Sequence, residues 1–389
     1  MTGAESTGAG SNVFSRQARR DLAIVFGLAV VGILVRYGVF LATFRIGGFD
    51  AYLDDLCVWD CAWYRTIIEE GYDLAPGIRY RPGGANWAFF PLQPLGIAAL
   101  HTLFGLPTLV AGFLLSNLYI LIAALAARPL FGANIRAYWL WVFALLIGPF
   151  SVLFSTLHTE SLFILLTVLT LVALQRRRYL HAGGWAALLS ATRVTGVLMG
   201  IAILVSAIAD QRRDGTPWRQ IPGRLLPDAD LVLGLCLAPL GLFCYMAYLQ
   251  LLSGDGLAFL HIQRAWGRDV GQPLSALWQA LAATPLLTPD SMLTTTWGWS
   301  AVLGLGLSVV LLLTGRQAAG TFTGLAILTS LSTGVTSMIR FSAGLVPLGM
   351  IASELFARWT IVYYATFPVV FLLGLATTAG WFRSSVLVM

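Results

Sequence analysis

Acidic residues are concentrated in one short segment of this sequence. Seven of its 18 carboxylates lie within residues 50–73, namely Asp50, Asp54, Asp55, Asp60, Glu69, Glu70 and Asp73. A carboxylate beside water can take the proton from an attacking hydroxyl group and so act as a general base. Asp60 is our first candidate for that role, with Asp55 and Asp54 in reserve. Two simpler roles stay open, because charges gather in solvated loops and an aspartate at the start of a helix can cap its N-terminus.

Three arginines are placed where they could bind an anion. Arg193 lies between two apolar segments, Arg340 lies in a short polar turn at 336–341, and Arg81 precedes a Phe-Phe-Pro segment. A planar guanidinium group pairs with two oxygens of a phosphate or of a carboxylate. The partner of these arginines is therefore either a lipid phosphate or an acidic side chain of the protein. All 24 basic residues of the chain are arginine, which excludes lysine chemistry such as Schiff-base formation.

Other side chains could orient a substrate. Glu160 opens an apolar helix, so it either caps that helix or faces a polar partner at membrane depth. His158 and His261 could line a polar pocket, although a hydrogen-bonded surface histidine is the commoner case. Trp63 and Trp266 could stack on a sugar or a prenyl unit, or anchor the chain at the membrane surface. The four histidines show no metal-binding spacing, and we expect no metal ion.

Two cysteines, Cys57 and Cys61, precede and follow Asp60. Their spacing of four residues fits one face of a single helix, where the geometry for a disulfide is poor. No second pair of Cys or His follows at zinc-binding spacing. We therefore expect a structural or incidental role for both side chains.

The elements that must position these residues are membrane helices. Of the 389 residues, 58% are hydrophobic and 11% are charged, against roughly 25% charged in a soluble protein. The mean hydropathy is +0.79. A soluble fold cannot bury so much apolar surface, so the sequence predicts an all-α polytopic membrane protein and excludes a nucleic-acid-binding module. The net charge of +6 fits the excess of basic residues in cytoplasmic loops.

Hydropathy predicts about 11 membrane-spanning helices, at 21–43, 108–127, 137–156, 160–174, 181–193, 195–209, 229–251, 297–314, 318–335, 342–357 and 360–380. Residues 1–20 form a cytoplasmic tail in this interpretation, and residues 21–389 form a single transmembrane domain. Two large loops, 44–107 and 252–296, face the outside. Because two prolines interrupt the segment 89–106, we expect a juxtamembrane or re-entrant helix there rather than a crossing.

The motifs together resemble the PIG-V family, the GPI mannosyltransferase II-like enzymes and their bacterial homologues. The segment 59–72 (Trp-Asp-x-x-Trp-Tyr-x-x-Ile-Ile-x-x-Gly-Tyr) is similar to that family's first outer loop. Further matches follow in order along the chain, at Phe89–Leu95, Thr159–Phe163, Thr192–Gly196, Phe259–Arg268 and Arg340–Phe341. The family's Trp-Asp motif does not require the neighbouring pair Asp54–Asp55.

The resemblance implies a GT-C glycosyltransferase fold with a catalytic acid in the first outer loop. It implies a polyprenyl-phosphate-linked sugar donor, mannose or similar, and no other cofactor. A hydroxyl of a glycan or glycolipid acceptor would attack the donor with inversion, and Asp60 would be the general base. Arg193, Arg340 and Arg81 would bind the donor phosphate, while Glu160, His158, Trp63, Trp266, His261 and Gln263 would contact substrate.

The expected location is the inner membrane of a bacterium, with the site facing the periplasm and with membrane lipids as neighbours. A transporter or flippase for an anionic lipid-linked solute is the alternative, since such proteins also use buried arginines and broken helices. The sequence contains no detectable inverted repeat, and its outer loop is long and acidic, both of which favour the enzyme.

Overall fold

The computed structural model describes residues 7–44, 47–77, 79–282 and 289–384. Within these ranges the chain forms helices and no strand, apart from a single bridge between Gly77 and Gly84. Six helical segments are long and apolar enough to cross a membrane: Arg16–Phe44, Thr108–Ala126, Val194–Arg213, Ala229–Ser253, Met292–Leu313 and Thr360–Phe382. The prediction of an all-helical membrane protein is therefore supported in its general form, whereas eleven crossings and the GT-C fold stay predictions.

Helices occupy every segment that hydropathy singled out. In the first half of the chain they are α1 (Thr7–Phe44), α5 (Thr108–Ala126), α6 (Ile135–Ile147), α7 (Glu160–Gln175), α8 (Tyr179–Ser190) and α9 (Met199–Arg213). In the second half they are α11 (Ala229–Leu237), α12 (Leu240–Ser253), α15 (Pro289–Leu313), α16 (Gln317–Leu331), α18 (Val346–Phe356) and α19 (Thr360–Phe382). The short helix α10 (Ile221–Leu225) joins α9 to α11.

Several boundaries differ from the prediction. The expected tail at 1–20 is helical from Thr7 onward, and residues 1–6 lie outside the described residues. The expected crossing at 137–156 ends at Ile147, because Gly148 is followed by Pro149 and an irregular segment. The helix expected at 297 already begins at Pro289, so the second outer loop is shorter than predicted.

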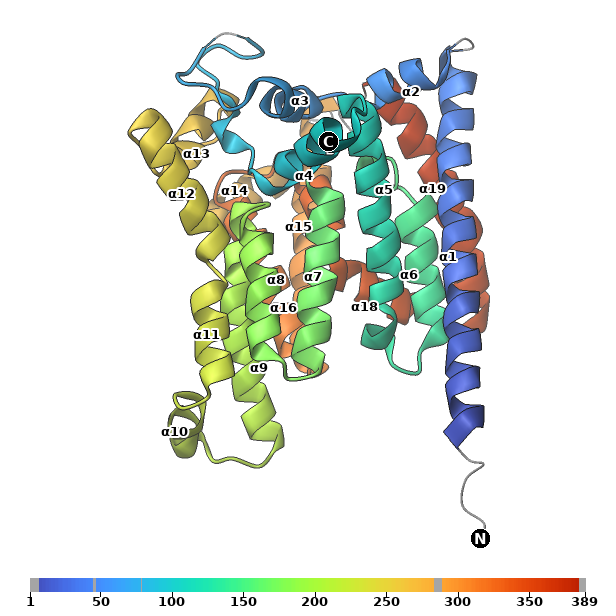
Figure 1. The fold of residues 1–389 in the computed structure, drawn as a ribbon, viewed down its shortest axis with the longest axis vertical. Coiled ribbons are helices and arrows are strands. Elements are labelled where there is room, and N and C mark those ends of the chain that lie inside the picture. The colour runs from blue at the N-terminus through green and yellow to red at the C-terminus, as the bar shows by residue number, and fades with distance from the viewer. Residues whose placement is uncertain (1–6, 45–46, 78, 283–288, 385–389) are drawn as a thin grey trace.

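The acid-rich segment lies at the end of the bundle opposite the N-terminus (Figure 1). It forms α2 (Phe49–Leu56) and α3 (Cys61–Glu70), and a short helical turn at Asn86–Ala88 leads into α4 (Leu92–Phe104). The second predicted loop contributes α13 (Ala258–His261), a turn at Ile262–Trp266 and α14 (Pro273–Ala282). Figure 1 shows α3 and α13 at the same end, so the two predicted outer loops meet there.

The expectation that Cys57 and Cys61 are poorly placed for a disulfide is wrong, because the two residues form one. The two residues do not lie on one helix. Cys57 follows the last residue of α2, whereas Cys61 begins α3, and the intervening Trp59 has a positive φ of 60°. This turn brings the two Cα atoms to 5.0 Å, within the range that a disulfide spans. The bond closes the turn that carries Asp60.

The helices bury small and aromatic residues against one another and leave large apolar side chains on the outside. Gly183 of α8 faces Gly234 of α11 so closely that a Cβ atom on Gly183 would lie 2.1 Å from the Gly234 carbonyl oxygen. On the outer surface, Leu34 of α1 and Ile361 of α19 are 61% and 85% exposed. Such exposure is unfavourable in water and ordinary in lipid. A close-packed interior within an apolar outer surface is what a membrane-spanning bundle requires.

Candidate functional site

Four charged residues that are far apart in the sequence form one network, which we call the arginine–carboxylate network: Asp60, Glu160, Arg193 and Arg340. Asp60 lies in the turn before α3, and Glu160 is the first residue of α7. Arg193 lies between α8 and the helical turn Val194–Leu198. Arg340 belongs to the short helix α17 (Met338–Ala343). The fold thus brings together four of the residues that the sequence analysis selected.

Charged hydrogen bonds join the four side chains. The Nη1 of Arg340 donates to Asp60 Oδ2 at 2.7 Å, and its Nε donates to Glu160 Oε1 at 2.7 Å. Arg193 Nη2 donates to the same oxygen of Glu160, and its Nε donates to Thr159 Oγ1 at 2.9 Å. Of the two possible partners for these arginines, the structure therefore shows protein carboxylates.

The exposed fraction separates the two carboxylates of the network. The side chain of Glu160 is fully buried and that of Arg340 is 6% exposed, whereas the side chain of Asp60 is 27% exposed. Glu160 is therefore enclosed between two arginines and cannot meet a large substrate without rearrangement. Asp60 is the carboxylate of the network that an arriving molecule can reach.

Neither carboxylate caps its helix. Asp60 occupies the N-cap position of α3 and Thr159 that of α7, yet no side-chain hydrogen bond caps either helix. The carboxylate of Asp60 turns to Arg340 instead, and that of Glu160 turns to Arg193 and Arg340. The simple capping roles considered for Asp60 and Glu160 are thus not the ones they play.

A close approach of two backbone segments holds Arg193 in place. A Cβ atom added to Gly196 would lie 2.3 Å from the carbonyl oxygen of Leu189, near the end of α8. Only glycine permits this contact without a shift of the backbone. The Gly196 N–H also donates to the Arg193 carbonyl oxygen at 2.9 Å. The Arg-x-x-Gly spacing of the sequence therefore closes the turn from which Arg193 reaches Glu160.

The pKa of Asp60 is lower than that of an ordinary aspartate. Burial acts to raise the pKa of this carboxyl group, but the positive charge of Arg340 outweighs it, with smaller effects from His158 and Arg268. Asp60 is consequently ionised at neutral pH. It is in the protonation state that a general base needs, and Arg340 fixes its direction.

His158 is a buried neutral partner of the network. Its ring lies between the aromatic rings of Tyr64 and Trp381, and Thr156 Oγ1 lies 2.5 Å from its Nδ1. Burial and the nearby charge of Arg340 lower the pKa of His158 to about 4. The opposite ring nitrogen, Nε2, has no hydrogen-bond partner among the described residues. His158 therefore contributes shape and polarity to the site, but no positive charge at neutral pH.

Arg268 is the residue that the sequence analysis left without a role. Its guanidinium group lies 5.7 Å from the ring centre of Phe341, and that of Arg193 lies 5.8 Å from the same ring. Arg268 lowers the pKa of Asp60, but within the described ranges it forms no ion pair. The site thus holds three guanidinium groups around two carboxylates. The signal in the sequence was the motif Gln263-x-x-Trp-Gly-Arg268, whose last residue received no assignment.

Aromatic rings cluster around Trp63 of α3, the helix that follows Asp60. The ring of Trp63 stacks on Phe89 at 5.8 Å and meets Trp266 at 5.5 Å. Arg81 places its guanidinium group 5.7 Å from the centre of the Trp266 ring. The predicted residues Trp63, Trp266 and Arg81 therefore lie together, next to the turn that bears Asp60.

The structure does not bring the remaining predicted residues into the network. Asp54 lines a separate cavity of about 330 Å³ with Arg65, Thr66 and Tyr80. For its neighbour Asp55, partial burial and the charge of Asp54 raise the pKa. His261 pairs with Asp255 at 2.7 Å on the surface. Gln263 lies in the turn before Trp266, and no side-chain hydrogen bond links it to the network.

The site offers hydrogen-bonding capacity but no cluster of metal ligands. Besides Nε2 of His158, the buried atoms Oε2 of Glu160 and Oγ of Ser161 have no hydrogen-bond partner among the described residues. Buried polar atoms are costly without a partner, so these atoms would gain hydrogen bonds from a small polar molecule or from a rearrangement of the site. Within the described ranges, no group of three or more His, Cys, Asp or Glu is arranged to hold a metal ion.

The chain matches no protein-family model and no curated protein at a significant level.

Proposed function

We propose that this protein is a membrane glycosyltransferase. It transfers a hexose, mannose on the basis of the resemblance to the PIG-V family, from a polyprenyl-phosphate donor to a hydroxyl group of a glycan or glycolipid acceptor. The observation that carries the proposal is the carboxylate of Asp60, which is partly exposed, ionised and held by Arg340, at the start of the helix whose Trp63 packs on Trp266. Such a reaction needs a base for the hydroxyl group of the acceptor and excess positive charge for the phosphate of the donor. It also needs flat apolar side chains for the sugar and the lipid.

In the proposed reaction, the acceptor hydroxyl oxygen attacks the anomeric carbon of the donor while Asp60 accepts its proton. The bond between that carbon and the phosphate oxygen breaks, and configuration at the carbon inverts. The leaving polyprenyl phosphate gains one negative charge. A fixed guanidinium group that has no protein counter-ion is suited to offset this charge as it develops.

The pairing of Arg193 and Arg340 with carboxylates refines the assignment of the phosphate-binding residues. They pair with Glu160, which is fully buried, and Arg340 itself is 6% exposed, so an arriving phosphate cannot easily displace these carboxylates, and we assign the two arginines to positioning the base. We assign Arg268, together with Arg81 on the face of Trp266, to the donor phosphate. Trp266 would then face the sugar or the first prenyl units, while Trp63, which is 5% exposed, packs against it.

The disulfide supports the predicted orientation. Disulfides persist in oxidising compartments and are rare in the cytosol. The Cys57–Cys61 bond holds the turn that carries Asp60, so a site facing the periplasm agrees with its chemistry. The opposite end of the bundle carries the arginine-rich segments 176–178 and 212–224, as the positive-inside tendency predicts for the cytoplasmic side.

The direct test is transfer by the purified protein in lipid nanodiscs. Radiolabelled polyprenyl-phosphate mannose is incubated with extracts of membrane glycans and glycolipids, and the label is followed into a new glycoside. We expect the label to leave the polyprenyl lipid and to appear in an α-linked product. Movement of the intact donor across a proteoliposome membrane without cleavage would instead support the transporter alternative.

A further inference from the structure

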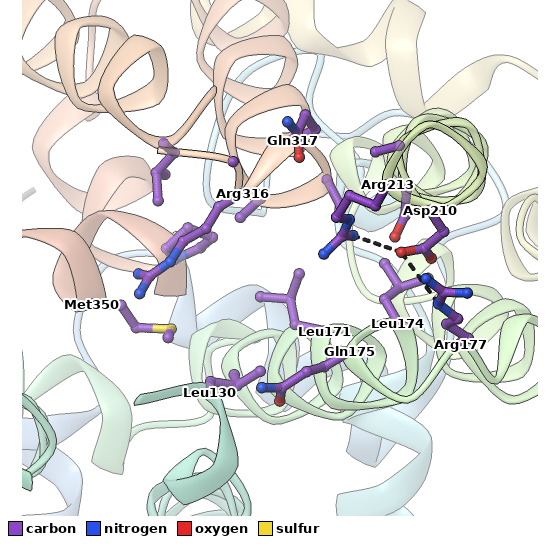
Figure 2. A pocket seen from close by; sticks show the side chains of 17 residues that line it. Leu130, Leu171, Leu174, Gln175, Arg177, Asp210, Arg213, Arg316, Gln317 and Met350 are labelled. Carbon is purple, nitrogen blue, oxygen red and sulfur yellow. Dashed lines mark hydrogen bonds and ion pairs between the residues drawn. The ribbon is translucent and has the colours of Figure 1, made fainter. Parts of the chain in front are cut away.

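A second cavity, shown in Figure 2, lies at the C-terminal end of α7, away from the arginine–carboxylate network at the start of that helix. Helix α7 connects the two places, since it begins at Glu160 in the network and ends at Gln175, which lines the cavity. A helix of this length spans roughly 24 Å. The cavity has a volume of about 250 Å³ and is lined mainly by residues of α7, α9, α16 and α18. The cavity takes no part in the proposed reaction.

Three arginines from three different segments line this cavity: Arg177, Arg213 and Arg316. Figure 2 shows Arg177 and Arg213 meeting Asp210 on one side, with Arg316 across the cavity from them. Arg213 Nη2 donates to Asp210 Oδ1 at 2.6 Å.

Each of the other two arginines also has an acidic partner. Arg177 pairs with Asp214 at 2.6 Å, and Arg316 Nη2 donates to Glu354 at 2.6 Å. The side chain of Arg316 is 34% exposed, but its second amino group, Nη1, is buried and has no hydrogen-bond partner among the described residues. A buried guanidinium N–H without a partner is costly, so a ligand that accepts from it gains a strong hydrogen bond.

The first turn of α16 opens into the same cavity. Gln317, Ala318 and Ala319 line it, and they are the first three residues of this 15-residue helix. No side chain caps the helix, and its first turn contains no acid. The backbone N–H groups of a first turn are unpaired within the helix and carry a partial positive charge. They add hydrogen-bond donors beside Arg316.

Apolar side chains form the rest of the lining: Leu130, Leu171, Leu174, Leu311 and Met350. In Figure 2, Leu171 lies between the two groups of arginines. The nearby segments carry more arginines than acids: Arg176, Arg178, Arg212, Arg219 and Arg224 against Asp228 and Asp230. The cavity combines arginine donors and leucine side chains in its lining, and the surrounding segments are basic. This combination fits an anion attached to an apolar chain.

We propose that this cavity binds the phosphate headgroup of an anionic phospholipid from the surrounding membrane. The phosphate accepts hydrogen bonds from Arg316, from Arg213 and from the first turn of α16, and an acyl chain lies over the leucines. Basic pockets between membrane helices on the cytoplasmic side are a known mode of lipid recognition. Glycosyl transfer plays no part in this proposal, so the lipid site can hold or fail independently of the enzymatic activity.

The experiment measures lipid binding to the full-length protein by native mass spectrometry. The protein is released from micelles containing phosphatidylglycerol or phosphatidylcholine of the same chain length. We expect phosphatidylglycerol to bind at least fivefold more tightly. Arg213→Gln should weaken this preference about fivefold, the effect of removing one basic group near an anionic lipid.

Arg316 is tested as the double variant Arg316→Gln/Glu354→Gln, so that no unpaired acid is left behind; it should also weaken binding about fivefold. Arg219→Gln, which removes an arginine of the same end outside the cavity, should leave binding unchanged.

Three results would overturn the proposal. In the first, phosphatidylglycerol and phosphatidylcholine bind equally well. In the second, Arg219→Gln reduces binding as much as the cavity variants do, which would mean that the lipid is attracted to the basic surface in general. In the third, inorganic phosphate alone displaces the lipid at equal concentration, which would mean a site for free phosphate. The thermal midpoint of each variant is measured in parallel, so that a loss of binding is compared only among folded proteins.

Discussion

Replacement of Arg340 tests the electrostatic centre of the network. Arg340→Gln removes two charged hydrogen bonds, each 2.7 Å long, to Asp60 and to Glu160. A hydrogen bond to a charged group contributes about 1.5–3 kcal/mol. Glu160 is fully buried, so its bond belongs near the upper value, although it keeps Arg193 as a partner. Asp60 is 27% exposed, and water replaces part of its lost bond.

We therefore expect Arg340→Gln to lower the free energy of unfolding by about 3–4 kcal/mol, in the range measured when one partner of a buried ion pair is removed. Arg65→Gln provides the matched control, because Arg65 pairs with Glu69 on α3 with 48% and 36% of the two side chains exposed. An exposed pair contributes at most about 1 kcal/mol. The measurement is unfolding in mixed micelles, followed by tryptophan fluorescence.

Arg340→Lys sharpens the comparison. Lysine keeps the positive charge but has no planar fork with which to reach both carboxylates, so its loss should fall between those of Arg65→Gln and Arg340→Gln. Equal stability of Arg340→Gln and Arg65→Gln would refute the reasoning, because it would mean that the buried network contributes no more than a surface pair.

Three further perturbations address the pH response, the disulfide and the glycine turn. Because the pKa of His158 falls to about 4 on folding from about 6.5 in an unfolded chain, the unfolded state binds the extra proton between these values. Stability should therefore fall as the pH drops below 6.5, by about 2 kcal/mol at pH 5, and His158→Asn should flatten this part of the unfolding curve. The double variant Cys57→Ser/Cys61→Ser should lose about 2 kcal/mol of unfolding free energy, because the disulfide closes a very short loop and so restricts the unfolded chain. Peptide mapping without reductant that finds both thiols free in the native protein would contradict the bond. Gly196→Ala should destabilise by about 1–3 kcal/mol through overpacking, whereas Gly184→Ala, where an added Cβ meets no atom within 4 Å, should not; similar thermal midpoints for the two variants would rule out a special role of the turn.

The membrane helices could be predicted because a long apolar run carries its own signal. Hydropathy located a helix at each expected segment, and prolines correctly marked the short helix α4 (Leu92–Phe104) as a separate element. The ends of helices were less predictable. Ile147 ends α6 at a glycine and a proline, although the apolar character of the sequence continues past it.

The residues of the network were predictable as individuals and not as partners. Arg193 and Arg340 stood out because they lie away from the basic segments, and Asp60 because it lies among acids. Arg340 joins Asp60 to Glu160, although it lies 280 positions from Asp60 and 180 positions from Glu160 in the sequence. A local pattern contains no information on such a contact.

Two features were missed for identifiable reasons. The Cys57–Cys61 disulfide was judged by helical spacing, but the chain turns between α2 and α3 at Trp59. Arg268 was overlooked because its importance depends on which charges lie near one another in the folded protein. Three guanidinium groups surround two carboxylates there, and Arg268 is the one without an ion pair among the described residues. Both depend on the path of the chain between elements.

The central claim, that Asp60 is the general base of a glycosyl transfer, is tested most directly by Asp60→Asn in the nanodisc transfer assay. Loss of a positioned base lowers the rate by about 10²–10⁴-fold, and we predict a loss in this range in a protein that stays folded. Glu69→Gln, which removes an exposed acid from the same loop, should transfer at the normal rate. Folded Asp60→Asn protein that transfers mannose at a near-normal rate would contradict the account.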